Sequence, residues 1–241
     1  MNSIGNNPNS FVNKIVDFCY VIYSVKRLNR VSPNFPDKKV SKTIKAPSSQ
    51  FLDLTSVMDS LGSDKGSFHS YTNIYETLLS HKRFELTKVL EIGIGSTDEL
   101  IPSNMGSFGK PGASLRGWKE FAPNAQIIGA DIDEKIMFSE ANIQTITLNQ
   151  LDRKSFKPLL EILNDGLDLV VIDGLHTPRA DLNSIIEILP YLKSDGNFFI
   201  EDIGNLASKF LWPKLLKLLN DDYFWEIYPN QKGNLVHINR L

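Results

Sequence analysis

The sequence has a single cysteine, Cys19, among 241 residues. One cysteine excludes an internal disulfide and any zinc site built from several cysteines. No apolar run approaches the roughly 20 residues that a transmembrane helix needs, so we expect no membrane span. No excess of one charge sign is present either, because 26 Lys and Arg stand against 28 Asp and Glu. We therefore expect no nucleic-acid partner bound through a general basic field.

The first fifty residues differ from the rest of the chain. The polar start, MNSIGNNPNS, lacks the positive region of a signal peptide, which together with the scarcity of cysteine favours a cytoplasmic location. Apolar residues near a 3.6-residue period predict a helix over 11–28, and prolines mark 29–50 as a linker. That helix would pack on the main domain, on a second copy in a homo-oligomer, or on a membrane surface. We expect residues 1–50 to be an appendage and 51–241 to form one domain.

Strands and helices alternate from about residue 53 onward, which predicts an α/β fold with a mainly parallel sheet. Two final strands flank a four-residue turn containing glycine, which predicts a C-terminal antiparallel hairpin. We expect seven strands with helices on both faces of the sheet. The expected strands are 88–93, 125–133, 143–148, 167–173, 196–202, 223–229 and 234–241.

Carboxylates follow four of the first five predicted strands. Each acid alone could simply cap the next helix, but ligands of open α/β sheets bind beyond the carboxyl ends of the strands. Asp173, Glu201 and Asp202 end two neighbouring strands and would repel one another unless a cation lies between them. Hard oxygen ligands favour Mg²⁺.

The loop after the first strand, EIGIGS, carries Gly93 and Gly95, where a backbone passes close to a ligand. A dinucleotide-binding loop would have a third glycine where this chain has Asp98, an anion that would repel a pyrophosphate. S-adenosylmethionine (SAM), cationic at its sulfonium, tolerates nearby acids. Asp131, at the end of the second strand, is placed for the ribose hydroxyls of such a cofactor.

Six motifs together resemble the class I SAM-dependent methyltransferases, over about 140 residues between Leu61 and Gly204. Within that superfamily the chain is similar to the metal-dependent sugar O-methyltransferases of macrolide biosynthesis, the mycinamicin type, and their cephalosporin-hydroxylase-like relatives. Leu175 and Gly204 depart from the Ser and His that this family often has there, which bears on the acceptor pocket. The motifs are GSDKGSFHSYTNIYE (62–76), VLEIGIGS (89–96), GASLRGWKEFAPNAQIIGADID (112–133), NQLD (149–152), VVIDGLH (170–176) and FIEDIG (199–204).

The resemblance implies a Rossmann-like fold, SAM and Mg²⁺ as cofactors, and a role for each matching residue. Asp173, Glu201 and Asp202 would hold the metal, and His176 would be the general base. Ser114 is also a candidate N-cap of a helix over 114–122. The implied cofactor-binding residues are Asp64, Lys65, Tyr71, Glu91, Gly93, Gly95, Ser114, Asp131, Gln150 and Asp173.

The leading function is therefore Mg²⁺- and SAM-dependent O-methylation of a hydroxyl on a sugar or glycosylated small molecule. A second hypothesis keeps SAM and methylates an amine or another small-molecule hydroxyl. A third, of a different class, is a non-catalytic SAM-binding regulatory or assembly protein. An NAD-dependent oxidoreductase is the fourth, which Asp98 disfavours.

Overall fold

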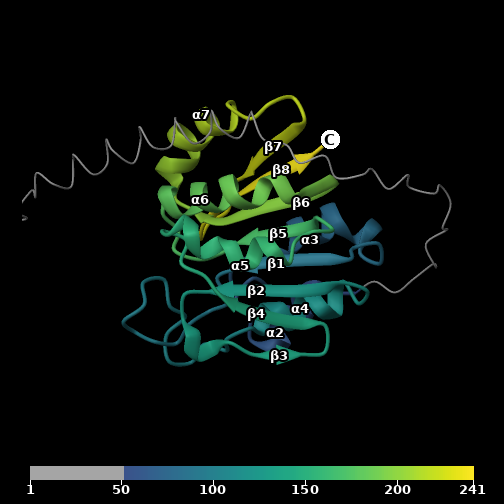
Figure 1. The fold of residues 1–241 in the computed structure, drawn as a ribbon, viewed down its shortest axis with the longest axis vertical. Helices are drawn as coiled ribbons and strands as arrows, with labels where there is room; N and C mark the ends of the chain where they lie inside the picture. Colours follow the sequence, from purple (N-terminus) through teal and green to yellow (C-terminus); the bar gives the residue numbers. More distant parts are fainter. Residues whose placement is uncertain (1–51) are drawn as a thin grey trace, which may run out of the picture.

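The computed structural model describes residues 52–241, which form an α/β fold around one eight-stranded sheet (Figure 1). The helix predicted over 11–28 and the linker over 29–50 lie outside the described residues. The strand order is β3-β4-β2-β1-β5-β6-β8-β7. The strands are β1 Lys88–Ile92, β2 Gln126–Asp131, β3 Ser139–Glu140, β4 Ile143–Thr147, β5 Leu167–Ile172, β6 Leu192–Ile203, β7 Tyr223–Tyr228 and β8 Asn234–Arg240.

Pairing within the sheet is mainly parallel, as predicted. The strands β4, β2, β1, β5 and β6 run parallel to one another, and β8 and β7 add the predicted antiparallel hairpin. The prediction of seven strands is wrong by one, because β3 pairs antiparallel with β4. A strand of two residues is too short to leave a period in the sequence.

Helices cover both faces of the sheet, as predicted (Figure 1). One layer holds α2 Leu54–Leu61, α3 Thr72–Leu79 and α4 Ala113–Phe121. The other holds α5 Lys157–Glu161, α6 Pro178–Ile188 and α7 Trp212–Leu216. The described residues also form five short helical turns: η1 Ser80–Lys82, η2 Glu134–Ile136, η3 Arg153–Phe156, η4 Leu189–Tyr191 and the π-helical η5 Ala207–Leu211.

Two hydrophobic cores lie on opposite faces of the sheet. Successive residues of a strand point to opposite faces, so Val89 joins the core under α2–α4 while Leu90 joins the one under α5–α7. The central strands are therefore buried on both faces, which explains their nearly continuous apolar sequences. The chain moves outward from β1 through β2 to β4, and then returns to the other side of β1 to form β5. This reversal between β1 and β5 is where open α/β sheets bind ligands.

None of the helices in residues 52–241 is long and apolar enough to cross a membrane.

Candidate functional site at the carboxyl ends of the central strands

A cavity of about 430 Å³ opens at the carboxyl ends of the central strands, where the reversal of strand order places a ligand site. The long loop after β1 also lines it, through residues 101–105. Acids outnumber lysines in the lining, so the cavity favours a cationic ligand over a pyrophosphate. The charged residues lining it are Asp64, Glu91, Asp131, Asp173 and Asp202, with Lys65 and Lys110.

Two glycines allow the loop after β1 to run close to its neighbours. Gly93 and Gly95 both adopt left-handed φ angles, 95° and 88°, which disfavour side chains. A Cβ on Gly93 would lie 2.0 Å from the carbonyl oxygen of Asp173, so the close approach itself also requires glycine. The loop is anchored by Asp131, whose Oδ2 accepts a hydrogen bond from the amide of Ile94 at 2.8 Å. Asp131 thus shapes the loop as well as lining the cavity.

Glu91 is buried at the end of β1, and α4 supplies two of its hydrogen bonds. Ser114 Oγ donates to Glu91 Oε1 at 2.7 Å, and Trp118 Nε1 donates to Oε2 at 2.6 Å. The prediction of Ser114 as a helix N-cap is wrong, because α4 begins one residue earlier and Gly112 is its N-cap. Ser114 lies in the first turn of the helix, where its hydroxyl faces the sheet and fixes Glu91.

Lys65 reaches from the segment before α3 into the sheet edge, where it is 1% exposed. Its Nζ donates to Asp173 Oδ2 and, at 2.7 Å, to Glu201 Oε2, and it lies 3.4 Å from Glu91 Oε1. The hydroxyl of Tyr75 donates to the other oxygen of Glu201. We call Lys65, Tyr75, Glu91 and Glu201 the buried network.

Electrostatics within the buried network are set by burial and by mutual neutralisation. Burial opposes the charge on Lys65, but the carboxylates of Asp173, Glu201 and Glu91 outweigh it and hold the pKa of Lys65 well above its ordinary value. Burial raises the pKa of both Glu91 and Glu201. Lys65 is therefore a permanent internal cation that compensates these acids.

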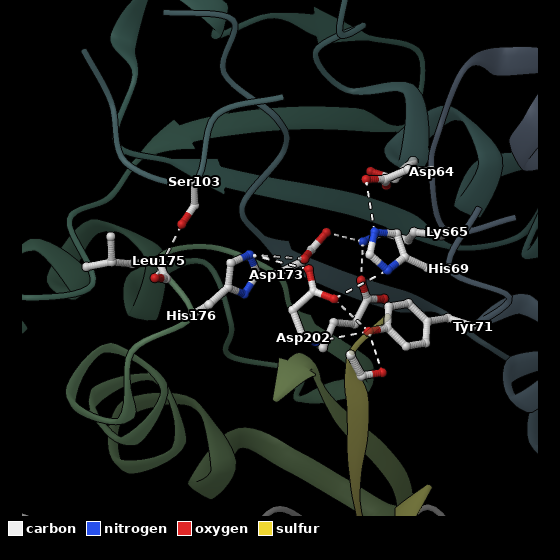
Figure 2. A network of polar contacts seen from close by, with 12 residues as sticks. Asp64, Lys65, His69, Tyr71, Ser103, Asp173, Leu175, His176 and Asp202 are labelled. Atoms are coloured by element: carbon white, nitrogen blue, oxygen red, sulfur yellow. Dashed lines mark hydrogen bonds and ion pairs between the residues drawn. The ribbon is translucent and has the colours of Figure 1, made fainter. Parts of the chain in front are cut away.

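Asp173, His176 and Asp202 form a second group, which we call the open cluster. His176 Nε2 lies 3.7 Å from Asp173 Oδ1 and 3.7 Å from Asp202 Oδ2. The three side chains are 20%, 24% and 27% exposed, and their ligand atoms lie within 4.8 Å of one another. Figure 2 shows both carboxylates between His176 on one side and His69 and Tyr71 on the other. The open cluster therefore presents nitrogen and oxygen ligands to the cavity.

The backbone of the open cluster is strained at two of its three residues. His176 has a φ of 52° and Asp202 a φ of 56°, both in the left-handed region. Non-glycine residues in that region persist only where their surroundings hold them, and they gather at functional sites. Gln150 supports the turn that carries His176, because its Oε1 accepts from the amide of Leu175 at 2.8 Å.

The predicted metal ligands are only partly gathered in one place. Asp173 and Asp202 meet in the open cluster together with His176, which was predicted as a base. Glu201 lies instead in the buried network. Asp173 is shared, since its Oδ1 faces His176 while its Oδ2 accepts from Lys65.

The other predicted cofactor residues are placed as follows. Asp64 lines the cavity. Gln150 also lines it, although its side-chain amide is bonded to Ser184 and Leu175. Tyr71 does not line the cavity and lies behind Asp202, to which its hydroxyl donates at 2.7 Å. Asp98 points away to Lys135, 2.8 Å from its Nζ, so the acids of the cavity lining, rather than Asp98, disfavour a pyrophosphate.

Comparisons with known proteins point to sugar O-methyltransferases. No protein-family model matches the chain. It is 29% identical over 161 residues to 8-demethyl-8-alpha-L-rhamnosyl tetracenomycin-C 2'-O-methyltransferase of Streptomyces olivaceus, covering 67% of this chain. It is 32% identical over 138 residues to mycinamicin VI 2''-O-methyltransferase of Micromonospora griseorubida, covering 57%. The matches span only 39% and 32% of the lengths of these two relatives.

A solved structure gives the same relationship. The methyltransferase MycE of the mycinamycin pathway, in complex with Mg and SAH (S-adenosylhomocysteine, demethylated SAM), superposes with a TM-score of 0.61 at 25% identity. The match covers 80% of this chain and 56% of that one. The chain is related to the macrolide and sugar O-methyltransferases. Its fold is that of a class I SAM-dependent methyltransferase, as the motifs predicted.

Proposed function

We propose that this protein transfers a methyl group from SAM to a hydroxyl of a sugar or glycosylated small molecule with the help of Mg²⁺. The observation that carries the proposal is the open cluster, in which a histidine faces two carboxylates inside an acidic cavity next to the glycine loop. The relatives named above are O-methyltransferases of glycosylated natural products, and the solved structure of MycE is a complex with Mg and SAH.

The charges and the glycine loop of the cavity suit SAM. The glycine loop would hold the amino-acid portion, Asp131 the ribose and Gln150 the region of the adenine. The carboxylates suit a sulfonium cation, which a net acidic lining stabilises by charge. These roles combine the predicted assignments with the positions of the residues around the cavity.

Asp173 and Asp202, the two carboxylates of the open cluster, would hold Mg²⁺, since carboxylate oxygens are its usual protein ligands. Glu201, the third predicted ligand, is bonded to Lys65 and Tyr75 instead. Asp173 links the open cluster to the buried network. Its Oδ1 faces His176, which also faces Asp202, and its Oδ2 accepts from Lys65, which also donates to Glu201. Bound together, the two cofactors supply an electrophilic methyl group and a Lewis acid that makes a coordinated hydroxyl more acidic.

His176 would accept the proton of the acceptor hydroxyl. Its ring lies in the open cluster at the cavity, and Nε2 is the atom that faces both carboxylates. Asp173 and Asp202 would orient that ring and the acceptor, so that the hydroxyl oxygen points at the methyl group. Positioning of this kind contributes much of the rate of a bimolecular transfer.

Methyl-labelled SAM tests the proposal against a panel of deoxysugar nucleotides and glycosides, with Mg²⁺ or with EDTA. We expect label in at least one acceptor, lost in EDTA and restored by Mg²⁺, while calorimetry shows unchanged SAH affinity in EDTA. Equal transfer rates with EDTA and with Mg²⁺ would show that the reaction needs no metal. Binding of NAD instead of SAH would show that SAM is not the cofactor.

A further inference from the structure

The hydroxyl of Tyr71 is tied to both the side chain and the backbone of Asp202. It donates to Asp202 Oδ1 at 2.7 Å and accepts from the amide of Asp202 at 3.2 Å. It also lies 2.9 Å from the carbonyl oxygen of Gly233, in the loop between β7 and β8. Tyr71 is fully buried, so its hydroxyl is enclosed among these groups of the protein.

Asp202 needs such support because its conformation departs from that of a regular strand. Glu201 and Asp202 lie where the register between β6 and β8 shifts, between Ile200 and Ile203. The left-handed φ of 56° at Asp202 is unfavourable for a residue with a side chain. The surroundings must therefore supply the interactions that hold it.

Gly233 leaves the space in which the contact between Tyr71 and Asp202 forms. A Cβ at this position would lie 2.5 Å from Asp202 Oδ1 and 2.7 Å from the Tyr71 hydroxyl. Its φ lies outside the left-handed region, so its backbone would accept an alanine. Space beside the carboxylate, rather than the shape of the turn, is what requires glycine.

The two oxygens of Asp202 consequently have different partners. Oδ1 faces Tyr71, and His69 Nδ1 lies 3.4 Å from it, with the His69 ring stacked on Tyr71 at 5.2 Å. Oδ2 faces His176 in the open cluster. Fixing Oδ1 on the protein leaves Oδ2 directed at the place where a metal would bind.

We propose that Tyr71, in the space left by Gly233, is a positioning residue that presents Asp202 Oδ2 to the metal. This inference rests on the proposed function, because it assigns a purpose to the orientation of a metal ligand. It gives Tyr71 a role toward the metal in place of direct contact with SAM.

The experiment measures Mn²⁺ affinity by electron paramagnetic resonance and SAH affinity by calorimetry on the full chain. The variants are Tyr71→Phe and Gly233→Ala, which remove the hydroxyl and intrude on its contact, respectively. The matched control is Tyr228→Phe. It removes a hydroxyl that donates to Glu226 over 2.7 Å and that does not line the cavity.

We expect both variants to weaken Mn²⁺ binding by at least about tenfold, the effect of losing a hydrogen bond to a charged group. SAH affinity should stay within about twofold of the wild type, and Tyr228→Phe should leave both affinities unchanged. Two independent variants keep the test decisive if one of them fails to fold.

Unchanged Mn²⁺ affinity in a folded Tyr71→Phe protein, even with a lowered melting temperature, would reduce Tyr71 to a packing residue and overturn this inference alone. A wild-type chain that binds no Mn²⁺ at millimolar concentration would overturn both this inference and the metal in the proposed function.

Discussion

The buried network and the open cluster lie next to each other, and Asp173 contacts both. They differ in whether hydrogen-bond donors of the protein satisfy their carboxylate oxygens. In the buried network, Glu91 and Glu201 are each 1% exposed, and protein donors satisfy their oxygens. In the open cluster, the single polar contact of Asp202 Oδ2 among residues 52–241 is His176 Nε2, at 3.7 Å. Acids satisfied by the protein stabilise the site, whereas those left facing the cavity can bind a ligand.

The comparison is tested most strongly by replacing the histidine of the open cluster. In His176→Ala we expect kcat for methyl transfer to fall by about 10²–10⁴-fold, the contribution of a general base. SAH affinity should stay the same, because the glycine loop is untouched. Part of the rate should return at high pH, where hydroxide replaces the base. His81→Ala, at an exposed histidine, serves as the control. Near-normal turnover in His176→Ala would mean that the open cluster needs no base.

Replacing the cation of the buried network should affect folding instead. Lys65→Met leaves several buried carboxylates without their counter-charge, so the free energy of unfolding should fall by about 3–5 kcal/mol. Urea unfolding without added metal or cofactor measures this loss. Lys135→Met, at a lysine whose side chain is 79% exposed, should leave the midpoint unchanged. An equally stable Lys65→Met protein would contradict a structural role for the buried network.

A smaller effect is expected at Asp131, which lines the cavity yet is largely satisfied by the protein. Asp131→Ala removes the acceptor for the Ile94 amide, and it also removes the proposed ribose contact. SAM affinity should fall by about 1–3 kcal/mol, as for one or two lost hydrogen bonds. Calorimetry measures it, with the exposed Asp165→Ala as control. Unchanged affinity would place the ribose elsewhere.

Local patterns in the sequence predicted most of the fold and the location of the site. The apolar sequences of β5 and β6 showed where each of these strands ends, and parallel strands bring such ends to one edge of the sheet, so Asp173 and Asp202 were expected together. Their meeting with His176 follows from the short turn after β5. The alternation of strands and helices predicted the two helical layers in the same way.

Contacts between residues far apart in the sequence could not be predicted from local patterns. Lys65 is 108 residues from Asp173, and Tyr71 is 162 residues from Gly233. No period or motif indicates which charged side chain turns inward, so the separation of Glu201 from the open cluster was not foreseen. Gly233 was interpreted only as part of a turn, because the space it leaves is visible only when β8 is paired.

The contact between Tyr71 and the Gly233 carbonyl has a consequence for the order of folding. Pairing β6 with β8 must precede the final placement of Asp202, since Gly233 directly precedes β8. Bringing Tyr71 to Gly233 closes a loop of 162 residues, which costs conformational entropy that local helices do not pay, so this contact forms late. A nascent chain can thus assemble the glycine loop and its neighbouring strands well before it gains a metal site. Refolding followed by Mn²⁺ uptake should show affinity appearing only after the bulk of the helical signal.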